Sequence, residues 1–144
     1  MTDSDEAFLQ ALETCVLPES DFGHTAHVRA AYLYLGAGDF ASALPRLQRT
    51  IRAYASSLGR PDRYHETITV AYLALIQQHI AQRGDGGGWD GFERHNPELL
   101  DQDLLLHFYS RSQLDSALAR RLFLLPDRHR CDADVNAAPS RRAR

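Results

Sequence analysis

Residues 21–35 read DFGHTAHVRAAYLYL and place two histidines, His24 and His27, three positions apart at the head of an otherwise apolar helix. Residues three apart on a helix share a face. A second stretch, residues 64–69 with the sequence YHETIT, opens another apolar helix with a polar group of the same kind. These two stretches predict a helical protein with a cluster of polar side chains at the start of two of its helices.

The remaining pattern also predicts helices. Apolar residues at helical spacing, bounded by capping residues, glycine and proline, predict the helices 3–15, 22–35, 40–58, 62–83, 89–95 and 113–124. Ser20 or Asp21 is the expected N-cap of the second helix, and Asp39 that of the third. No segment alternates apolar and polar residues as a strand does. We therefore expect an all-α fold, a compact bundle of four main helices with a C-terminal helical cap.

Composition restricts the class of protein. The chain has 144 residues, which suits one domain, and we expect that domain over residues 1–127. Residues 128–144 are polar and rich in arginine, and we expect a disordered tail there. A formal net charge of −3 argues against a nucleic-acid partner. The acidic N-terminus and the lack of a long apolar run predict a cytoplasmic protein with no membrane segment.

The positions of the histidines predict a metal site. In an up-down-up-down bundle the second and fourth helices run parallel, so both polar clusters lie at the same end. His24, His27 and His65 would then converge on one divalent transition metal. Glu66 would be a fourth ligand, a partner that orients a histidine, or a general base on a metal-bound water. Tyr64 and Glu66 are the candidate catalytic residues.

The same residues resemble a family of small bacterial helical proteins. The shared pattern is FxHxxH(V/L)RxAxxYL, then YHET(I/L)T, then a Leu-Leu…Tyr-Ser-Arg segment and a terminal Pro-Asp. It is present here as residues 22–35, 64–69, 104–111 and 126–127. Tyr72 departs from it, where tryptophan is expected. The resemblance implies a site at His24, His27, His65 and Glu66, but it implies no particular reaction.

Two functions follow from these patterns. The first is a metal-dependent enzyme that acts on a small molecule, with Fe, Zn or Cu as the metal. The residues expected around the metal are apolar and rich in tyrosine, which favours an oxidoreductase or oxygenase over a hydrolase. The second is a non-catalytic helical interaction protein, in which the His/Glu cluster is a structural hydrogen-bond network. Either function is compatible with a homodimer.

Overall fold

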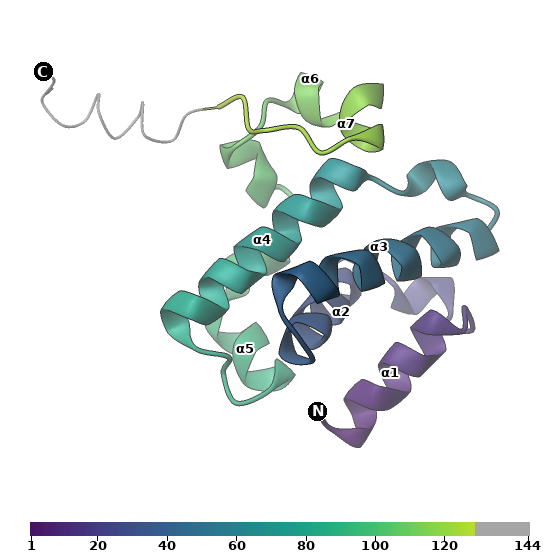
Figure 1. Ribbon diagram of the computed structural model, residues 1–144, viewed down its shortest axis with the longest axis vertical. Coiled ribbons are helices and arrows are strands. Elements are labelled where there is room, and N and C mark those ends of the chain that lie inside the picture. Colours follow the sequence, from purple (N-terminus) through teal and green to yellow (C-terminus); the bar gives the residue numbers. More distant parts are fainter. Residues whose placement is uncertain (129–144) are drawn as a thin grey trace, which may run out of the picture.

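The computed structural model describes residues 1–128, and every regular element in that range is a helix or a 3₁₀ turn (Figure 1). The all-α expectation is confirmed. The elements are α1 (Asp3–Glu13), η1 (Glu19–Asp21), α2 (His24–Gly36), α3 (Phe40–Ser57), η2 (Pro61–Arg63), α4 (Glu66–Arg83), α5 (Trp89–His95), η3 (Pro97–Leu100), η4 (Leu104–His107), α6 (Arg111–Leu114) and α7 (Ala117–Arg121).

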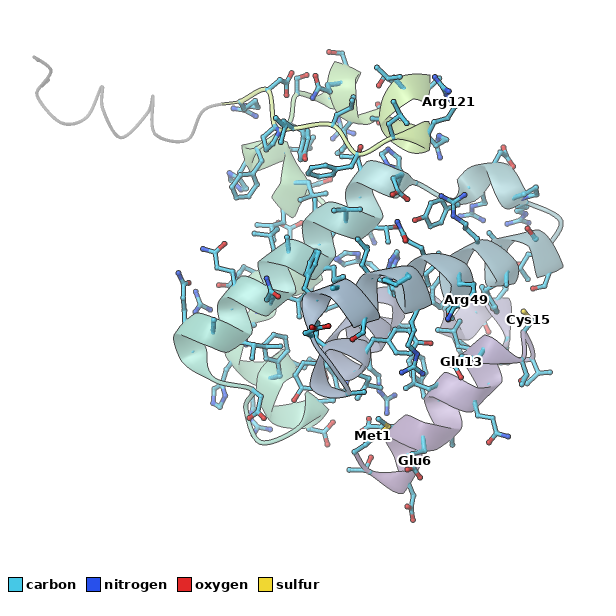
Figure 2. The ribbon with its side chains drawn as sticks, viewed as in Figure 1. Met1, Glu6, Glu13, Cys15, Arg49 and Arg121 are labelled. Carbon is cyan, nitrogen blue, oxygen red and sulfur yellow. The ribbon has the colours of Figure 1, made fainter. Side chains whose placement is uncertain are left out.

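Local capping explains where several helices begin. Thr2 and Asp39 each form a capping box at the head of α1 and α3, in which a side chain accepts a hydrogen bond from the third backbone N–H of the helix. The acidic first turn of α1 follows the helix dipole, and Glu6 lies on its outer surface (Figure 2). Pro45 lies inside α3, at an exposed position, and the helix begins at Phe40 as its cap predicts.

The predicted N-terminal ends of two helices, α2 and α4, are wrong. Ser20 and Asp21 belong to the 3₁₀ turn η1, so the N-cap of α2 is Gly23, which has no side chain to cap the helix. Helix α4 begins at Glu66 and not near Asp62. His65 has extended backbone angles and caps α4 with its own side chain, so the residues before it form the separate turn η2.

Helices α2, α3 and α4 pack against one another and form the centre of the molecule (Figure 1). The apolar side of α2 is fully buried there, and Tyr34 and Leu33 keep less than a twentieth of their surface exposed. Helix α1 covers α3, and α5 with η3 packs against α2. Burial of these apolar faces is the main source of stability for the bundle.

The C-terminal cap differs from the single helix predicted over 113–124. Ser110 and Ser116 each cap a short helix, so the chain forms α6 and α7 in succession. Thr67 of α4 donates a hydrogen bond to the carbonyl of Leu122 and accepts one from the N–H of Leu124, which attaches the segment after α7 to the bundle. The predicted disordered tail, apart from Arg128, lies outside the described residues.

No helix within residues 1–128 has both the length and the apolar character needed to cross a membrane.

Candidate functional site

A pocket of about 560 Å³ opens where η1 and α2 meet the end of α3 and the start of α4. His24, His27 and His65 all line it, and we call it the histidine pocket. Three of the four predicted ligands therefore line one cavity. Glu66 does not line it.

His24 is held by the backbone of η3. Its Nε2 atom lies 2.9 Å from the carbonyl oxygen of Leu99, which can only accept, so Nε2 carries the hydrogen. The imidazole ring meets the ring of Tyr72 edge-on, with centroids 4.7 Å apart. These contacts fix the ring of His24 on the wall of the pocket.

His27 is the least satisfied polar side chain of the site. Its Nε2 atom is buried and has no hydrogen-bond partner within the described part of the chain. The ring stacks on Phe22, with centroids 6.0 Å apart. Burial, followed by the neighbouring His24, lowers the pKa of His27 from 6.5 to about 4. His27 is therefore a neutral imidazole at neutral pH.

His65 uses both ring nitrogens to hold the fold together. Its Nδ1 atom accepts a hydrogen bond of 3.2 Å from the N–H of Ile68, which caps α4. Its Nε2–H donates a bond of 2.7 Å to the carbonyl of Leu114 in α6. Burial lowers the pKa of His65, which keeps the ring in this neutral form. A metal would have to displace one of these bonds to reach a nitrogen lone pair.

Glu66 and Tyr64 form a second polar group, directed toward α3. The Tyr64 hydroxyl donates to one carboxylate oxygen of Glu66 at 2.6 Å, and Gln48 donates to the other at 2.7 Å. Arg52 lies over the Tyr64 ring, 4.3 Å from its centroid, and 3.4 Å from Glu66. The carboxylate is thus occupied by Gln48 and Arg52 of α3 and by Tyr64, and Tyr64 itself lines the histidine pocket.

The four predicted ligands do not form one ligand set in this structure. Among residues 1–128 there is no group of three or more His, Cys, Asp or Glu side chains placed to hold a metal ion. His65 and Glu66 are neighbours in sequence, but their polar atoms bind different elements. Metal binding and the catalytic roles of Glu66 and Tyr64 stay predictions.

Sequence reasoning missed the residues that shape the rest of the pocket. Tyr54 and Tyr72 line it, but their hydroxyls donate to the carbonyls of Leu17 and Asp101. Arg60 and Arg63 also line it, from the turn just before the YHET stretch. The stretch 60–63, with the sequence RPDR, places two arginines in a predicted turn directly before the YHET stretch, and this pattern could have indicated that they lie near the site.

Comparisons with models of known protein families, with curated proteins and with solved structures found no match to this chain.

Proposed function

We propose that this protein binds a small molecule in the histidine pocket and recognises it through the Nε2 atom of His27. One observation carries this proposal: His27 lines a cavity of about 560 Å³, and its Nε2 atom is buried without a hydrogen-bond partner within the described residues. Cavities of roughly 300–1,000 Å³ that are mainly apolar, with a few polar groups, are typical small-molecule sites.

The cost of leaving a polar atom unpaired supports the proposal. A buried polar group without a hydrogen bond destabilises the folded state by about 1–3 kcal/mol. His24, His65 and Tyr72 all have partners in the fold. His27 alone of the pocket imidazoles has none at Nε2, so a ligand that supplies a partner would remove this cost.

The low pKa of His27 indicates what it can do. A neutral imidazole can accept or donate one hydrogen bond at Nε2, according to its tautomer. A histidine with a pKa of about 4 is a weak base at neutral pH. Proton transfer by His27 would therefore need a ligand whose charge raises that pKa, and recognition of a polar group is the simpler role.

The proposal is tested with a fragment library and His27→Leu. Ligand-observed NMR selects binders, and ¹⁵N spectra of the histidine rings report which imidazole each binder reaches. We expect binders to shift the His27 resonances and to lose most of their affinity in His27→Leu. The matched control is His95→Ala, since His95 is exposed and lies outside the pocket. Binders that shift other residues and keep full affinity for His27→Leu would refute the proposal.

A metal-dependent enzyme is the second candidate. Its support is that His24 and His27, one turn apart on α2, both line the pocket and that Nε2 of His27 has no partner. Neutral imidazole is the commonest metal ligand, and Fe, Zn or Cu would suit it. Elemental analysis of protein purified without a histidine tag tests this: stoichiometric metal that is lost in His27→Ala supports it, and protein free of metal after growth with all three argues against it.

A purely structural hydrogen-bond network is the remaining alternative. It accounts for His65, which caps α4, and for Glu66, which binds Tyr64 and Gln48. It does not account for His27, whose Nε2 atom joins no network within residues 1–128. For this reason we place recognition at His27 first.

A further inference from the structure

We infer that the ligand of the histidine pocket is an uncharged alcohol or phenol, whose hydroxyl group donates its hydrogen to the Nδ1 atom of His24. This inference rests on the proposed function and adds the chemical class of the ligand. The hydrogen bonds that the fold has already formed support it, because they leave the buried part of the pocket wall with acceptors.

The bond between His24 and Leu99 fixes the tautomer of the His24 ring. The carbonyl of Leu99 accepts at 2.9 Å, so Nε2 carries the hydrogen and, in the neutral ring, Nδ1 keeps a lone pair. No hydrogen-bond partner of Nδ1 lies within residues 1–128. In that range the only buried side-chain nitrogen or oxygen without a partner is Nε2 of His27, so Nδ1 of His24 is accessible. His24 therefore offers a ligand an acceptor on the wall of the pocket.

The buried hydroxyl groups of the wall have already donated their hydrogens to the fold. Tyr54 and Tyr72 donate to backbone carbonyls at 2.7 and 2.8 Å, and Tyr64 donates to a carboxylate at 2.6 Å. Thr69 donates to a backbone carbonyl at 2.8 Å. All four side chains line the pocket and are buried. Their oxygens can still accept a hydrogen bond, so this part of the wall suits a ligand that brings its own donor.

The charged side chains at the pocket favour an uncharged ligand. Glu19, Arg60 and Arg63 line it, and the Glu19 carboxylate lies 2.6 and 3.7 Å from the two guanidinium groups. Asp21 and Asp62 lie beside them in the chain, so three carboxylates stand against two arginines and no positive charge is left to bind an acid. Both arginines already share the carboxylate of Glu19. An ammonium group at the histidines would therefore be buried without a counterion, which destabilises the complex.

His27 can bind the oxygen of the same hydroxyl group. His24 and His27 are three positions apart on α2 and share a face of the helix. The neutral ring of His27 can carry its hydrogen on Nε2 and donate it to the hydroxyl oxygen. A hydroxyl group both donates and accepts, whereas an ether oxygen only accepts and an ammonium group only donates. Phe22, Ile51 and Leu105, which also line the pocket, provide apolar surface for the rest of the ligand.

The test compares three matched probes, benzyl alcohol, benzyl methyl ether and benzylamine, at pH 8 in the presence of EDTA. Ligand-observed NMR measures their affinities. We expect the alcohol to bind about three- to tenfold more tightly than the ether, the range of one neutral hydrogen bond, and the amine to bind most weakly. In ¹⁵N spectra of the free protein, the hydrogen of the His24 ring should be on Nε2. The Nδ1 resonance should shift when the alcohol binds and stay in place when the ether binds.

Two substitutions of His24 separate the roles of its two nitrogens. His24→Gln keeps an amide N–H for the carbonyl of Leu99 and removes the acceptor at Nδ1, so the preference for the alcohol over the ether should disappear. His24→Asn places an amide oxygen near the position of Nδ1 and loses the bond to Leu99, so the preference should remain. Both variants lose the ring contact with Tyr72, and the ratio of the two affinities within one protein cancels this loss. His95→Gln is the matched control, because His95 is exposed and lies outside the pocket.

The outcomes distinguish this inference from the proposed function. An ether or an amine that binds as tightly as the alcohol overturns the inference, and so does a His24 ring with its hydrogen on Nδ1. A preference for the alcohol that persists in His24→Gln, or that is lost equally in His24→Asn, also overturns it. Recognition by His27 still stands if binders shift the His27 resonances and lose affinity in His27→Leu. If no probe binds at millimolar concentration the alcohol inference fails, and both proposals fail if the fragment library also has no binder that reaches His27.

Discussion

The Nε2–H group of His65 donates a hydrogen bond of 2.7 Å to the backbone carbonyl of Leu114. This bond joins the N-cap of α4 to α6, across 49 positions of the chain. Because Nδ1 of the same ring caps α4, one buried side chain positions two elements.

Replacement of His65 should therefore reduce stability. We expect His65→Ala to lower the free energy of unfolding by about 2–3 kcal/mol, since it removes a helix cap and a buried hydrogen bond. His65→Asn keeps the cap but cannot reach Leu114, and should lose about half as much. Urea denaturation measures both, and the exposed His107→Ala serves as control with a change within about 0.5 kcal/mol. A stable His65→Ala protein would show that this residue is free for another role.

Stability should also decrease at mildly acidic pH. The pKa of His27 is about 4 in the folded protein, below its ordinary value of 6.5, so the unfolded chain takes up a proton first as the pH falls. The contribution of neutral His27 is complete above pH 6.5 and is lost progressively between pH 6.5 and 4, by up to about 3 kcal/mol. The lowered pKa of His65 acts in the same direction.

Urea denaturation between pH 8 and pH 4.5 measures how steeply the free energy of unfolding decreases with pH. In His27→Leu the free energy of unfolding should depend less on pH, because the contribution of His27 is removed. In the control His95→Ala, which changes an exposed residue, the pH dependence should equal that of the wild type. Equal slopes in the wild type and in His27→Leu would mean that His27 takes up its proton in the folded protein near the ordinary pKa.

Glu66 should stabilise the fold without contributing to ligand affinity. Glu66→Ala removes the acceptor of the Tyr64 hydroxyl and of Gln48, so we expect a loss of about 1–3 kcal/mol in the free energy of unfolding. Glu66 does not line the histidine pocket and reaches its wall only through Tyr64, so we expect the affinity of the fragment binders to stay within about twofold of the wild type. A folded Glu66→Ala protein that loses ligand or metal would instead support the catalytic role expected from the sequence.

Two glycines of the segment after α4 approach each other too closely for a side chain. A Cβ atom on Gly91 would lie 2.0 Å from the carbonyl oxygen of Gly86. We expect Gly91→Ala to destabilise by about 2 kcal/mol or more, because backbone must move. Gly36→Ala is the matched control: the position is helical, and an added Cβ would meet nothing within 4 Å beyond its own stretch of helix, so that change should stabilise by about 0.5–1 kcal/mol. Thermal unfolding measures whether each substitution lowers or raises the stability of the protein.

The sequence by itself determined most of the helices. Asp39 and the apolar spacing after it predicted a helix over 40–58, and α3 spans Phe40–Ser57. The short helix predicted over 89–95 is α5, Trp89–His95. Caps, glycines and periodicity act within a few residues of the chain, so they can be read from the order of residues alone. The prediction that His24, His27 and His65 lie close together needed an assumed bundle topology in addition, and these three residues do line one pocket.

Only the tertiary structure decided what each polar side chain does there. His65 and Glu66 are adjacent in sequence, yet His65 binds Leu114 in α6 and Glu66 binds Gln48 in α3. His24 reaches Leu99, while Nε2 of His27, one turn further along the same helix, is buried without a partner in the described chain. A ring nitrogen takes its partner from whichever element packs against it. That element comes from a distant part of the chain, so no local pattern distinguishes an imidazole that holds the fold from one whose nitrogen is left without a partner.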